Sequence, residues 1–219
     1  IADGLSEGTY EVTVTDENGC TAADSRTLTQ PDSIQIDNYY STDISCNGAS
    51  DGEVHLSASG GSGTKWYTLT PEGGSGNTNT EGDFTGLSPG NYTVSVSDDN
   101  SCPGPEVKDT ITEPAPLSIN LVESTNITGC HGDATGSINV DADGGNGSLT
   151  YTLKDNGGST VGENGNGEFT GLTAGTYTVE VDDSEGCGPI TTSDIVIDEP
   201  TAIDITNTSA SDASCTGGS

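Results

Sequence analysis

The sequence predicts an all-β fold, and three observations support that prediction. Apolar and polar residues alternate along short stretches such as 92–96, Tyr-Thr-Val-Ser-Val, and a period of two indicates half-buried strands. No window of about ten residues keeps a helical period. Gly, Ser, Thr, Asn and Asp interrupt the chain roughly every 8 to 12 residues, a spacing typical of antiparallel β-sandwiches.

Composition excludes two kinds of partner and a membrane-spanning segment. The 219 residues include 35 Asp and Glu against 4 Lys and Arg, and this net charge of -31 excludes nucleic acid and anionic membrane surfaces as partners. No stretch approaches the ~18 apolar residues of a membrane span. Leu, Ile, Val and Phe make up only about 17% of the chain, as in disordered proteins, but the strand pattern outweighs this composition.

A repeat of about 84 residues determines the architecture. The pattern Leu-x-x-Gly-x-Tyr-x-Val-x-Val, followed by Asp and then Cys, begins at Leu5, Leu87 and Leu172. A Cys-x-Gly turn recurs at Cys46, Cys130 and Cys215, and Gln-Pro or Glu-Pro closes each copy, at Pro31, Pro114 and Pro200. We therefore expect a piece of a longer exported polypeptide, with the C-terminal part of a truncated repeat, two complete repeats and the first strand of a following repeat. Their residues are 1–32, 33–116, 117–200 and 201–219.

Each complete repeat is predicted to be an immunoglobulin-like antiparallel β-sandwich, and the repeats to form a tandem, extended array. Seven or so short strands in about 84 residues fit this fold. In the first complete repeat we expect strands near 34–45, 53–59, 64–70, 82–85, 91–97 and 106–112, with a weak extra strand within 72–80. The recurring Tyr falls at the tyrosine corner of such a sandwich, where the phenol bonds back to the preceding turn. These residues are Tyr10, Tyr92 and Tyr177.

The six cysteines, in a chain with so few apolar residues, indicate disulfides and an oxidising, extracellular compartment. In one sandwich, the turn after the first strand and the turn after the sixth lie about 40 Å apart, beyond the reach of a disulfide. Two arrangements remain open. The slightly preferred one joins Cys46 to Cys187 of the next repeat and braces the array. The other forms a hairpin about each Pro segment, and its pairs are Cys20 with Cys46, Cys102 with Cys130, and Cys187 with Cys215.

Acidic residues cluster in the turn after the sixth strand, at Asp16, Asp98, Asp99, Asp182 and Asp183. Converging carboxylates can bind Ca²⁺, but Asp is also preferred in tight turns for backbone reasons alone. Turn chemistry is the favoured interpretation, calcium is the alternative, and no other cofactor is indicated. A second acidic pair, Asp141 and Asp143, looks more like part of a calcium loop, although the other complete repeat has no acid there.

Nothing in the sequence indicates an enzyme. His55 and His131 are the two histidines, and neither recurs between repeats, so no general base belongs to the repeat. Trp66 and Tyr67 form the remaining candidate site. They are either an exposed aromatic platform for a glycan or, by strand alternation, one core residue and one surface residue.

The order of motifs resembles a known family. Cys-x-Gly, Gly-Gly, an aromatic third strand, and Leu-x-x-Gly-x-Tyr-x-Val-x-Val-x-Asp with a following Cys are similar to the SprB-type repeat of Bacteroidota gliding-motility adhesins and related giant surface proteins. The resemblance covers the whole chain. It is less close at the third strand, where the family usually has Pro-Tyr after Gly-Gly and this chain has Thr-Lys-Trp-Tyr at 64–67. It implies export by the type IX system and, in gliding relatives, movement by a motor.

The predicted function is therefore the structural or adhesive shaft of a long, secreted adhesin or extracellular filament at the cell surface. Its expected partners are neighbouring repeats, other copies that pair through edge strands in a fibre, and a polysaccharide or abiotic surface. The negative charge keeps such repeats solvated and prevents lateral collapse. The alternatives are an array of carbohydrate-binding modules and the accessory domains of a secreted hydrolase.

Overall fold

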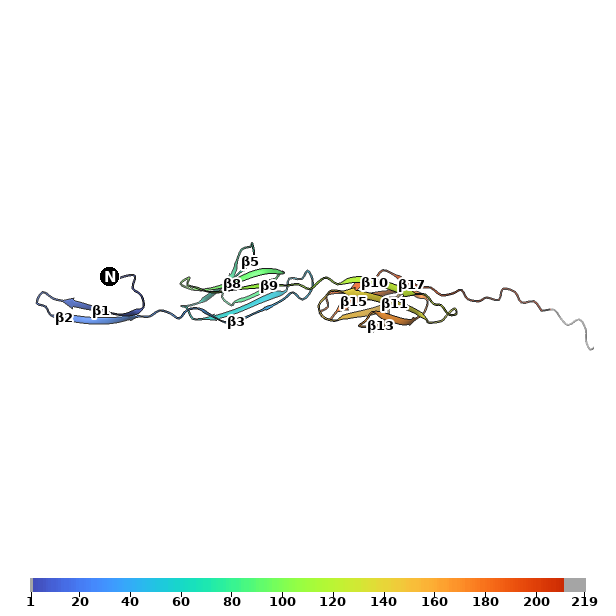
Figure 1. Cartoon of the computed structure of the whole chain (residues 1–219), viewed down its shortest axis with the longest axis horizontal. Coiled ribbons are helices and arrows are strands. Elements are labelled where there is room, and N and C mark those ends of the chain that lie inside the picture. The colour runs from blue at the N-terminus through green and yellow to red at the C-terminus, as the bar shows by residue number, and fades with distance from the viewer. Residues whose placement is uncertain (1, 211–219) are drawn as a thin grey trace, which may run out of the picture. The chain divides into compact units, whose positions relative to one another are not determined.

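The computed structural model describes residues 2–210, and β-strands are the regular elements in that range (Figure 1). No helix in residues 2–210 is long and apolar enough to cross a membrane. The chain divides into two compact units. The first contains the residues up to Ile44 together with Ala49–Thr112, and the second contains Ser45–Gly48 and the residues from Glu113 onward.

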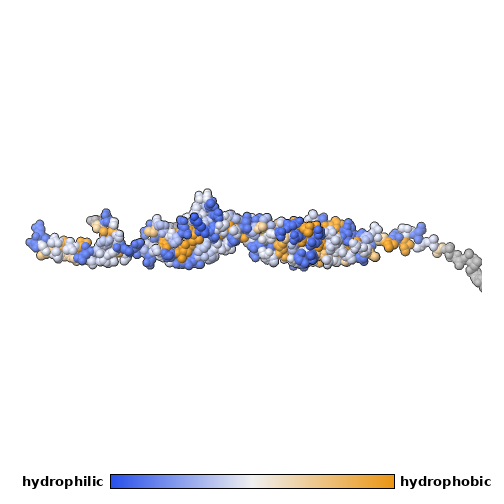
Figure 2. Space-filling model, viewed as in Figure 1, coloured by the Kyte–Doolittle hydropathy of each residue, from blue (hydrophilic) through white to orange (hydrophobic). Residues whose placement is uncertain are grey.

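The first unit begins with a hairpin of two antiparallel strands, β1 (Gly8–Thr15) and β2 (Thr21–Leu28), paired along their full length. Its valines lie on the surface. Val12 and Val14 are each 65% exposed, and Figure 2 shows hydrophobic atoms on the outside of this hairpin. The hairpin thus forms from its alternating, β-branched sequence and its cross-strand pairs without burial in a core.

The rest of the first unit is a sandwich of two antiparallel sheets. One sheet has the strand order β3 (Gln35–Thr42), β4 (Gly52–Ser59), β7 (Asp83–Leu87). The other has the order β6 (Asn77–Asn79), β5 (Lys65–Pro71), β8 (Gly90–Asp98), β9 (Pro103–Ile111). The first, second and fifth strands of the sandwich therefore form one sheet, and the third, fourth, sixth and seventh form the other. This is the immunoglobulin-like arrangement predicted from the sequence.

Alternate residues of the strands make the core of this sandwich. Val54 and Leu56 of β4, and Val94 and Val96 of β8, are at most 2% exposed, and the residues between them are more exposed. The period of two in the sequence is thus the alternation between core and surface. At the start of β4 only glycine fits, because a Cβ on residue 52 would lie 2.8 Å from Cγ2 of the buried Ile111.

The second unit repeats this sandwich. Its three-stranded sheet has the order β10 (Ser118–Thr125), β11 (Gly136–Asp143), β14 (Glu168–Leu172). Its larger sheet has the order β13 (Thr160–Asn164), β12 (Leu149–Asp155), β15 (Gly175–Asp183), β16 (Ile190–Thr191), and β17 (Ile195–Ile197) also pairs with β15. A separate cluster of buried apolar residues fills it. The all-β, immunoglobulin-like fold class is confirmed in both units.

The last strand differs between the two units. β9 is continuous, whereas its counterpart is broken into β16 and β17. The stretch from Cys187 to Ile197 holds one more residue than its counterpart in the first unit, and an extra residue in one strand of an antiparallel pair makes a bulge. Thr192 spans the break: its N–H donates to the Val179 carbonyl and its Oγ1 accepts from the Val179 N–H, both at 3.0 Å.

Residues 201–210, expected to begin the first strand of a following repeat, form no strand, and Ile203 and Ile205 are 99% and 76% exposed. A first strand such as β3 pairs with the second strand of its own repeat, from which it takes its hydrogen bonds. The remainder of this segment, including Cys215, lies outside the described residues.

Candidate functional site

The acidic turn between β8 and β9 is held by hydrogen bonds from the backbone to a buried carboxylate. Asp98 is 3% exposed. Its Oδ1 accepts from the N–H groups of Asn100 and Cys102, both at 2.9 Å, and its Oδ2 accepts from the N–H of Ser62 at 2.8 Å. These bonds, led by the one from Cys102, favour the charged form and hold the pKa of Asp98 below its ordinary value.

The corresponding turn after β15 is built in the same way. Asp183 Oδ1 accepts from the N–H groups of Glu185 at 3.0 Å and Cys187 at 2.8 Å, and Oδ2 accepts from the N–H of Asn146 at 2.5 Å. Burial raises the pKa of Asp183, but hydrogen bonds from these backbone groups outweigh burial and leave the pKa below its ordinary value. The carboxylate thus organises the loop that ends in a cysteine.

The other acidic candidates are spread over turns and a strand. Asp16 accepts from the N–H of the cysteine that ends its own turn, at 2.8 Å, and Asp182 Oδ1 accepts from the N–H of Gly188 at 2.9 Å. Asp141 and Asp143 lie on β11. Among residues 2–210 no group of three or more His, Cys, Asp or Glu side chains is placed to hold a metal ion. In these turns the aspartate side chains accept hydrogen bonds from nearby backbone N–H groups, as is typical of Asp in tight turns.

A tyrosine anchors each of three hairpins. Its phenol O–H donates to a carbonyl four residues earlier, in the turn before the strand. The pairs are Tyr10 with Ser6 at 2.9 Å, Tyr92 with Ser88 at 2.8 Å and Tyr177 with Thr173 at 3.0 Å. The bond is the same in the exposed first hairpin as in the two sandwiches, so the local sequence alone is sufficient to form it.

A disulfide joins two different copies of the repeat. Cys46 follows β3 of the first copy, and Cys187 ends the acidic turn of the second; their Cα atoms are 5.2 Å apart and 141 residues separate them. This Cα separation is ordinary for a disulfide. The pair is the first of the two arrangements left open by the sequence. Its Cys-x-Gly turn, Ser45–Gly48, belongs to the second compact unit.

Hydrogen bonds on two sides hold this turn beside the disulfide. The N–H of Gly48 donates to Glu113 Oε2 at 2.8 Å, and Asn47 Nδ2 donates to the Pro114 carbonyl at 3.0 Å. The Gly-rich loop, residues 144–147, lies between β11 and β12. From this loop, Asn146 Nδ2 donates at 3.1 Å to the carbonyl that precedes Cys46. The Cys-x-Gly turn, the Glu-Pro pair, the Gly-rich loop and the acidic turn together form what we call the Cys-x-Gly junction.

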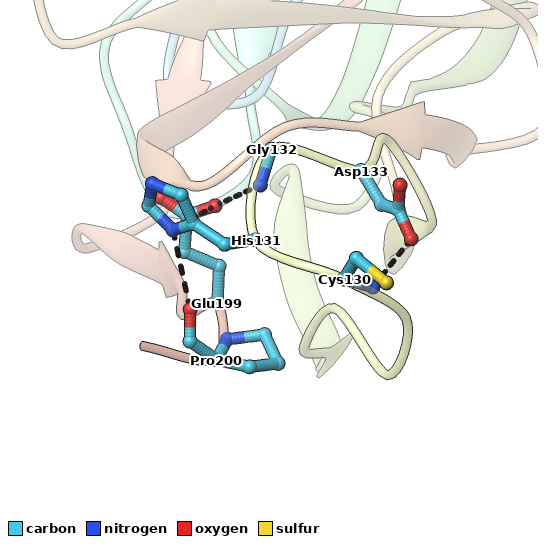
Figure 3. A network of polar contacts seen from close by, with 6 residues as sticks. All are labelled: Cys130, His131, Gly132, Asp133, Glu199 and Pro200. Carbon is cyan, nitrogen blue, oxygen red and sulfur yellow. Dashed lines mark hydrogen bonds and ion pairs between the residues drawn. The ribbon is translucent and has the colours of Figure 1, made fainter. Parts of the chain in front are cut away.

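The turn at Cys130 has the same internal support (Figure 3). The N–H of Gly132 donates to Glu199 Oε2 at 2.7 Å, and His131 Nδ1 lies 3.2 Å from the Pro200 carbonyl oxygen. The thiol of Cys130 is free and exposed. The repeat in the sequence predicts the turn and the closing proline, but it does not predict that the glutamate accepts a hydrogen bond from the turn glycine. The signal was the glutamate before proline in both complete repeats.

The remaining cysteines do not form the pairs of the second, hairpin arrangement. Cys20 and Cys102 are free and exposed, like Cys130, and Cys215 lies outside the described residues. The hairpin arrangement is not formed, because Cys46 and Cys187 bond to each other and Cys102 and Cys130 are both free. The reason is local: the Cys46 turn is held on the Glu-Pro pair beside the second acidic turn.

The two aromatic candidates point to opposite faces of β5. Tyr67 is 5% exposed, and its phenol oxygen accepts from the N–H of Ala58 at 3.1 Å. Trp66 is 43% exposed, and its Nε1 donates to Asp99 Oδ1 at 3.0 Å. This bond, and then one from the N–H of Thr64, lower the pKa of Asp99. The pair therefore forms no joint platform, and neither residue lines the hollow of about 670 Å³ over β5, β8 and β9.

Other titratable side chains are used to tie strands together. His55 stacks on Tyr40 with ring centroids 4.5 Å apart and contacts Asp83 on the next strand. The phenol of Tyr39 on β3 donates to Asp109 on β9 at 2.5 Å. Burial, followed by this hydrogen bond, raises the pKa of Tyr39 to about 12. These contacts link neighbouring strands or the edges of the two sheets.

Several solved structures are similar to the chain. Three N-terminal domains of the Highly Immunogenic Outer Capsid protein of bacteriophage RB49 align at 15% identity and a TM-score of 0.46, over 75% of this chain and 59% of that one. The N-terminal eight Ig domains of Down Syndrome Cell Adhesion Molecule align at 17% identity and a TM-score of 0.44, over 87% and 28%. The C-terminal fragment of intimin, in complex with the intimin-binding domain of its receptor, aligns at 20% identity and a TM-score of 0.41, over 74% and 64%. The chain thus spans less than two thirds of each of these chains.

Sequence comparisons give one family. A search of curated proteins finds no match. The family model of the SprB repeat matches residues 38–74 and 121–158. Each match begins within the first strand of a sandwich and ends just after the third, so it includes one Cys-x-Gly turn. The resemblance to the SprB repeat is thereby confirmed at two places in the chain.

Proposed function

We propose that this chain is a load-bearing segment of a secreted, surface-attached adhesin or extracellular filament, in which the repeats act as structural units. The observation that carries the proposal is the Cys46–Cys187 bond between two copies of the repeat. The two SprB matches support it, as do the two sandwiches with a buried core in each.

The disulfide gives tension a covalent path that avoids most of the chain. When the two ends are pulled apart, force passes from Cys46 directly to Cys187, so residues 47–186 carry no load. These residues include β8 and β15, the central strands that supply buried valines to both cores. Stretching therefore leaves the greater part of both sandwiches folded, which is what the shaft of an adhesin requires.

The surface chemistry suits a solvated shaft. A net charge of -31 makes neighbouring segments repel one another at distances up to the Debye length, about 8 Å in physiological salt. The SprB resemblance extends the proposal to surface proteins of Bacteroidota that are exported by the type IX system and, in gliding cells, moved by a motor. An antibody against this chain should label intact cells of its source.

Single-molecule pulling from both ends tests the load path. Without reductant, extension should stop before residues 47–186 are released. Reduction should add the length of the chain between the two cysteines, which are 141 positions apart, or about 500 Å at ~3.6 Å per residue. Cys102→Ser removes a free thiol but keeps the disulfide, so it is the matched control and should behave as the unaltered chain. Equal extension with and without reductant would contradict the proposal.

The exposed Trp66 favours carbohydrate binding as a second function. Half-exposed tryptophan faces are suited to stacking on sugar rings, and the Nε1 bond to Asp99 fixes the ring. Retention on a glycan array that is lost in Trp66→Ala but kept in Tyr40→Ala, another exposed aromatic of the same unit, would support this function. If the unaltered chain is not retained on the glycan array, carbohydrate binding is contradicted and the structural role is the one function that remains.

A further inference from the structure

The Cys-x-Gly junction of the second unit has a counterpart in the first unit that ends in a free thiol. Cys102 ends the β8–β9 acidic turn as Cys187 ends the turn after β15, and each N–H donates to the buried aspartate four residues earlier. Beside Cys102 lies a cavity of about 440 Å³, the Cys102 groove, whose lining includes Gln30, Pro31 and Ser62. We propose that this groove binds the Cys-x-Gly turn of another repeat of this type, and that the bound turn forms a disulfide with Cys102.

One wall of the groove matches the Glu-Pro side of the junction. Gln30 and Pro31 close the first hairpin as Glu113 and Pro114 close the first complete repeat. In the second unit, a Glu113 carboxylate oxygen and the Pro114 carbonyl accept hydrogen bonds from Gly48 and from the residue before it. The Gln30 side chain has a neutral amide oxygen where Glu113 has a carboxylate oxygen, and the Pro31 carbonyl matches the Pro114 carbonyl. This wall therefore has one acceptor for each of the two bonds of a Cys-x-Gly turn.

Another part of the groove lining, Gly61 and Ser62, matches the Gly-rich side of the junction. The N–H of Gly61 donates to the Asp32 carbonyl at 2.7 Å, and the counterpart bond in the second unit measures 2.9 Å. The Gly-rich loop is therefore fixed to the segment after the proline in the same way in both units. Ser62 stands where Asn146 stands, and Asn146 donates to the Ser45 carbonyl of the bound turn. The hydroxyl of Ser62 is a donor at the same place.

The chain itself specifies the occupant. Two described turns that follow the first strand of a repeat have the Cys-x-Gly sequence, and the one at Cys46 is seated in the second-unit junction. The turn at Cys130 has the same bond to its own glutamate and an exposed thiol (Figure 3). The pairing rule seen at Cys46 and Cys187 joins the turn cysteine of one repeat to the acidic-turn cysteine of the next. By that rule Cys102 receives a turn from a preceding repeat, and Cys130 supplies one to a following repeat.

Such pairing would link every repeat to its neighbours through overlapping loops. Cys130 lies between Cys46 and Cys187 in sequence, so the loop that it closes would begin inside the loop already closed. The inference goes beyond the proposed function, because the groove and the thiol carry it whether or not the chain bears load.

The covalent step is thiol–disulfide exchange. The Cys102 thiolate attacks the sulfur of a turn cysteine that is held as a mixed disulfide with a small thiol such as glutathione. The Cys102–turn S–S bond forms, the bond to glutathione breaks, and glutathione leaves as the thiolate and takes up a proton. No net oxidation occurs in this step, because the oxidant was consumed in making the mixed disulfide.

Disulfide trapping with a peptide tests the groove. The probe is residues 43–50 as a free peptide, with its cysteine as a glutathione mixed disulfide, added to the full chain with its own disulfide intact. Cys20 is the matched control, because it is also free and exposed and ends the equivalent acidic turn of the first hairpin, which among residues 2–210 has no second sheet packed on it. We expect peptide mapping to find Cys102 modified about tenfold more than Cys20, because docking raises the local thiol concentration. Oxidised glutathione alone should show no such preference, and equal modification by the peptide would overturn the proposal.

Two substitutions at one position separate docking from reactivity. Ser62→Tyr places a large side chain in the groove and should reduce the preference for Cys102 to that seen with glutathione. Ser62→Asn introduces the residue found at this place in the second-unit junction and should keep or increase the preference. Trp66 fluorescence checks that both variants fold. Preference that survives Ser62→Tyr in a folded chain would overturn the proposal, whereas the pulling experiment on the Cys46–Cys187 bond would be unaffected.

Discussion

Three hairpins built from the pattern Leu-x-x-Gly-x-Tyr-x-Val-x-Val have the same hydrogen bonds but differ in what covers them. Each has a tyrosine bonded to the turn before it and an aspartate that accepts from the cysteine N–H four residues later. Val12 of the first hairpin is 65% exposed, whereas Val94 and Val179 of the second and third are 0% exposed. Within residues 2–210, the third hairpin alone carries a disulfide.

The difference separates three levels of organisation. The tyrosine and aspartate bonds join residues close in sequence, so they form in any copy of the pattern. Burial requires the facing sheet, whose strands are tens of residues away, as β4 is from β8. The disulfide requires a turn from another copy of the repeat. Local bonds shape the hairpin, the opposite sheet makes it a domain, and the neighbouring repeat fixes the junction.

Removal of the disulfide should cause the largest loss of stability, and the loss should fall on the second unit, which contains the third hairpin. We expect Cys187→Ser to lower the free energy of unfolding of the second unit by about 2–4 kcal/mol, because the bond restricts the unfolded chain across a long loop. Hydrogen exchange at core amides such as Val179 measures it. Cys102→Ser changes the equivalent free thiol and should alter stability by less than about 0.5 kcal/mol. Equal effects of the two substitutions would show that the bond contributes no stability.

Truncation of the equivalent valines should distinguish the covered hairpin from the uncovered one. Val94→Ala leaves a cavity in a packed core and should cost roughly 2–3 kcal/mol. Val12→Ala removes a methyl pair already in water and should change stability by less than about 0.5 kcal/mol. Urea unfolding followed by fluorescence reports the first unit, since Trp66 is the single tryptophan of the chain. Similar losses would mean that the first hairpin is buried in solution.

Much of the fold could be predicted because its signals are local. The alternation along β4, β5 and β8 marks both strand position and buried face, and the repeat transfers each assignment to the second unit. The predictions were less accurate at the last strand. The strand expected near 106–112 begins already at Pro103, and its counterpart is split, because one extra residue changes the pairing without leaving a periodic signal.

The candidate site was predictable in its residue types but not in its assembly. The tyrosine bonds follow from the pattern, and the Cys46–Cys187 pair is one of the two arrangements that the positions of the turns left open. The acceptor role of Glu113 and the groove beside Cys102 did not follow. Both depend on which loops lie side by side in the folded chain. The sequence shows which side chains each loop carries but not which other loop it contacts.

Loss of one phenol should have a smaller effect than loss of a core valine. Tyr177→Phe keeps the ring but leaves the Thr173 carbonyl without its bond, and should cost about 0.5–1.5 kcal/mol, since the residue is 6% exposed. Tyr10→Phe removes the same bond in the exposed hairpin, where water replaces it, and should cost less. Hydrogen exchange at the flanking strand amides measures both. A larger loss at Tyr10 would show that the bond, not its burial, controls hairpin stability.

Acid should weaken both covered hairpins through the aspartates of their turns. The pKa of Asp98 is lowered by hydrogen bonds from Cys102 and Ser62, so the folded chain binds its proton less readily than the unfolded chain. The stabilisation is therefore complete above the unfolded pKa, near 4, and is lost as the pH falls below that value through the folded pKa. Asp98→Asn should make Trp66-detected unfolding less dependent on pH below about 4. Asp183→Asn changes the equivalent carboxylate of the other unit and should leave the Trp66 signal with its original pH dependence. An equal change in both variants would mean that the acid response does not arise within each turn.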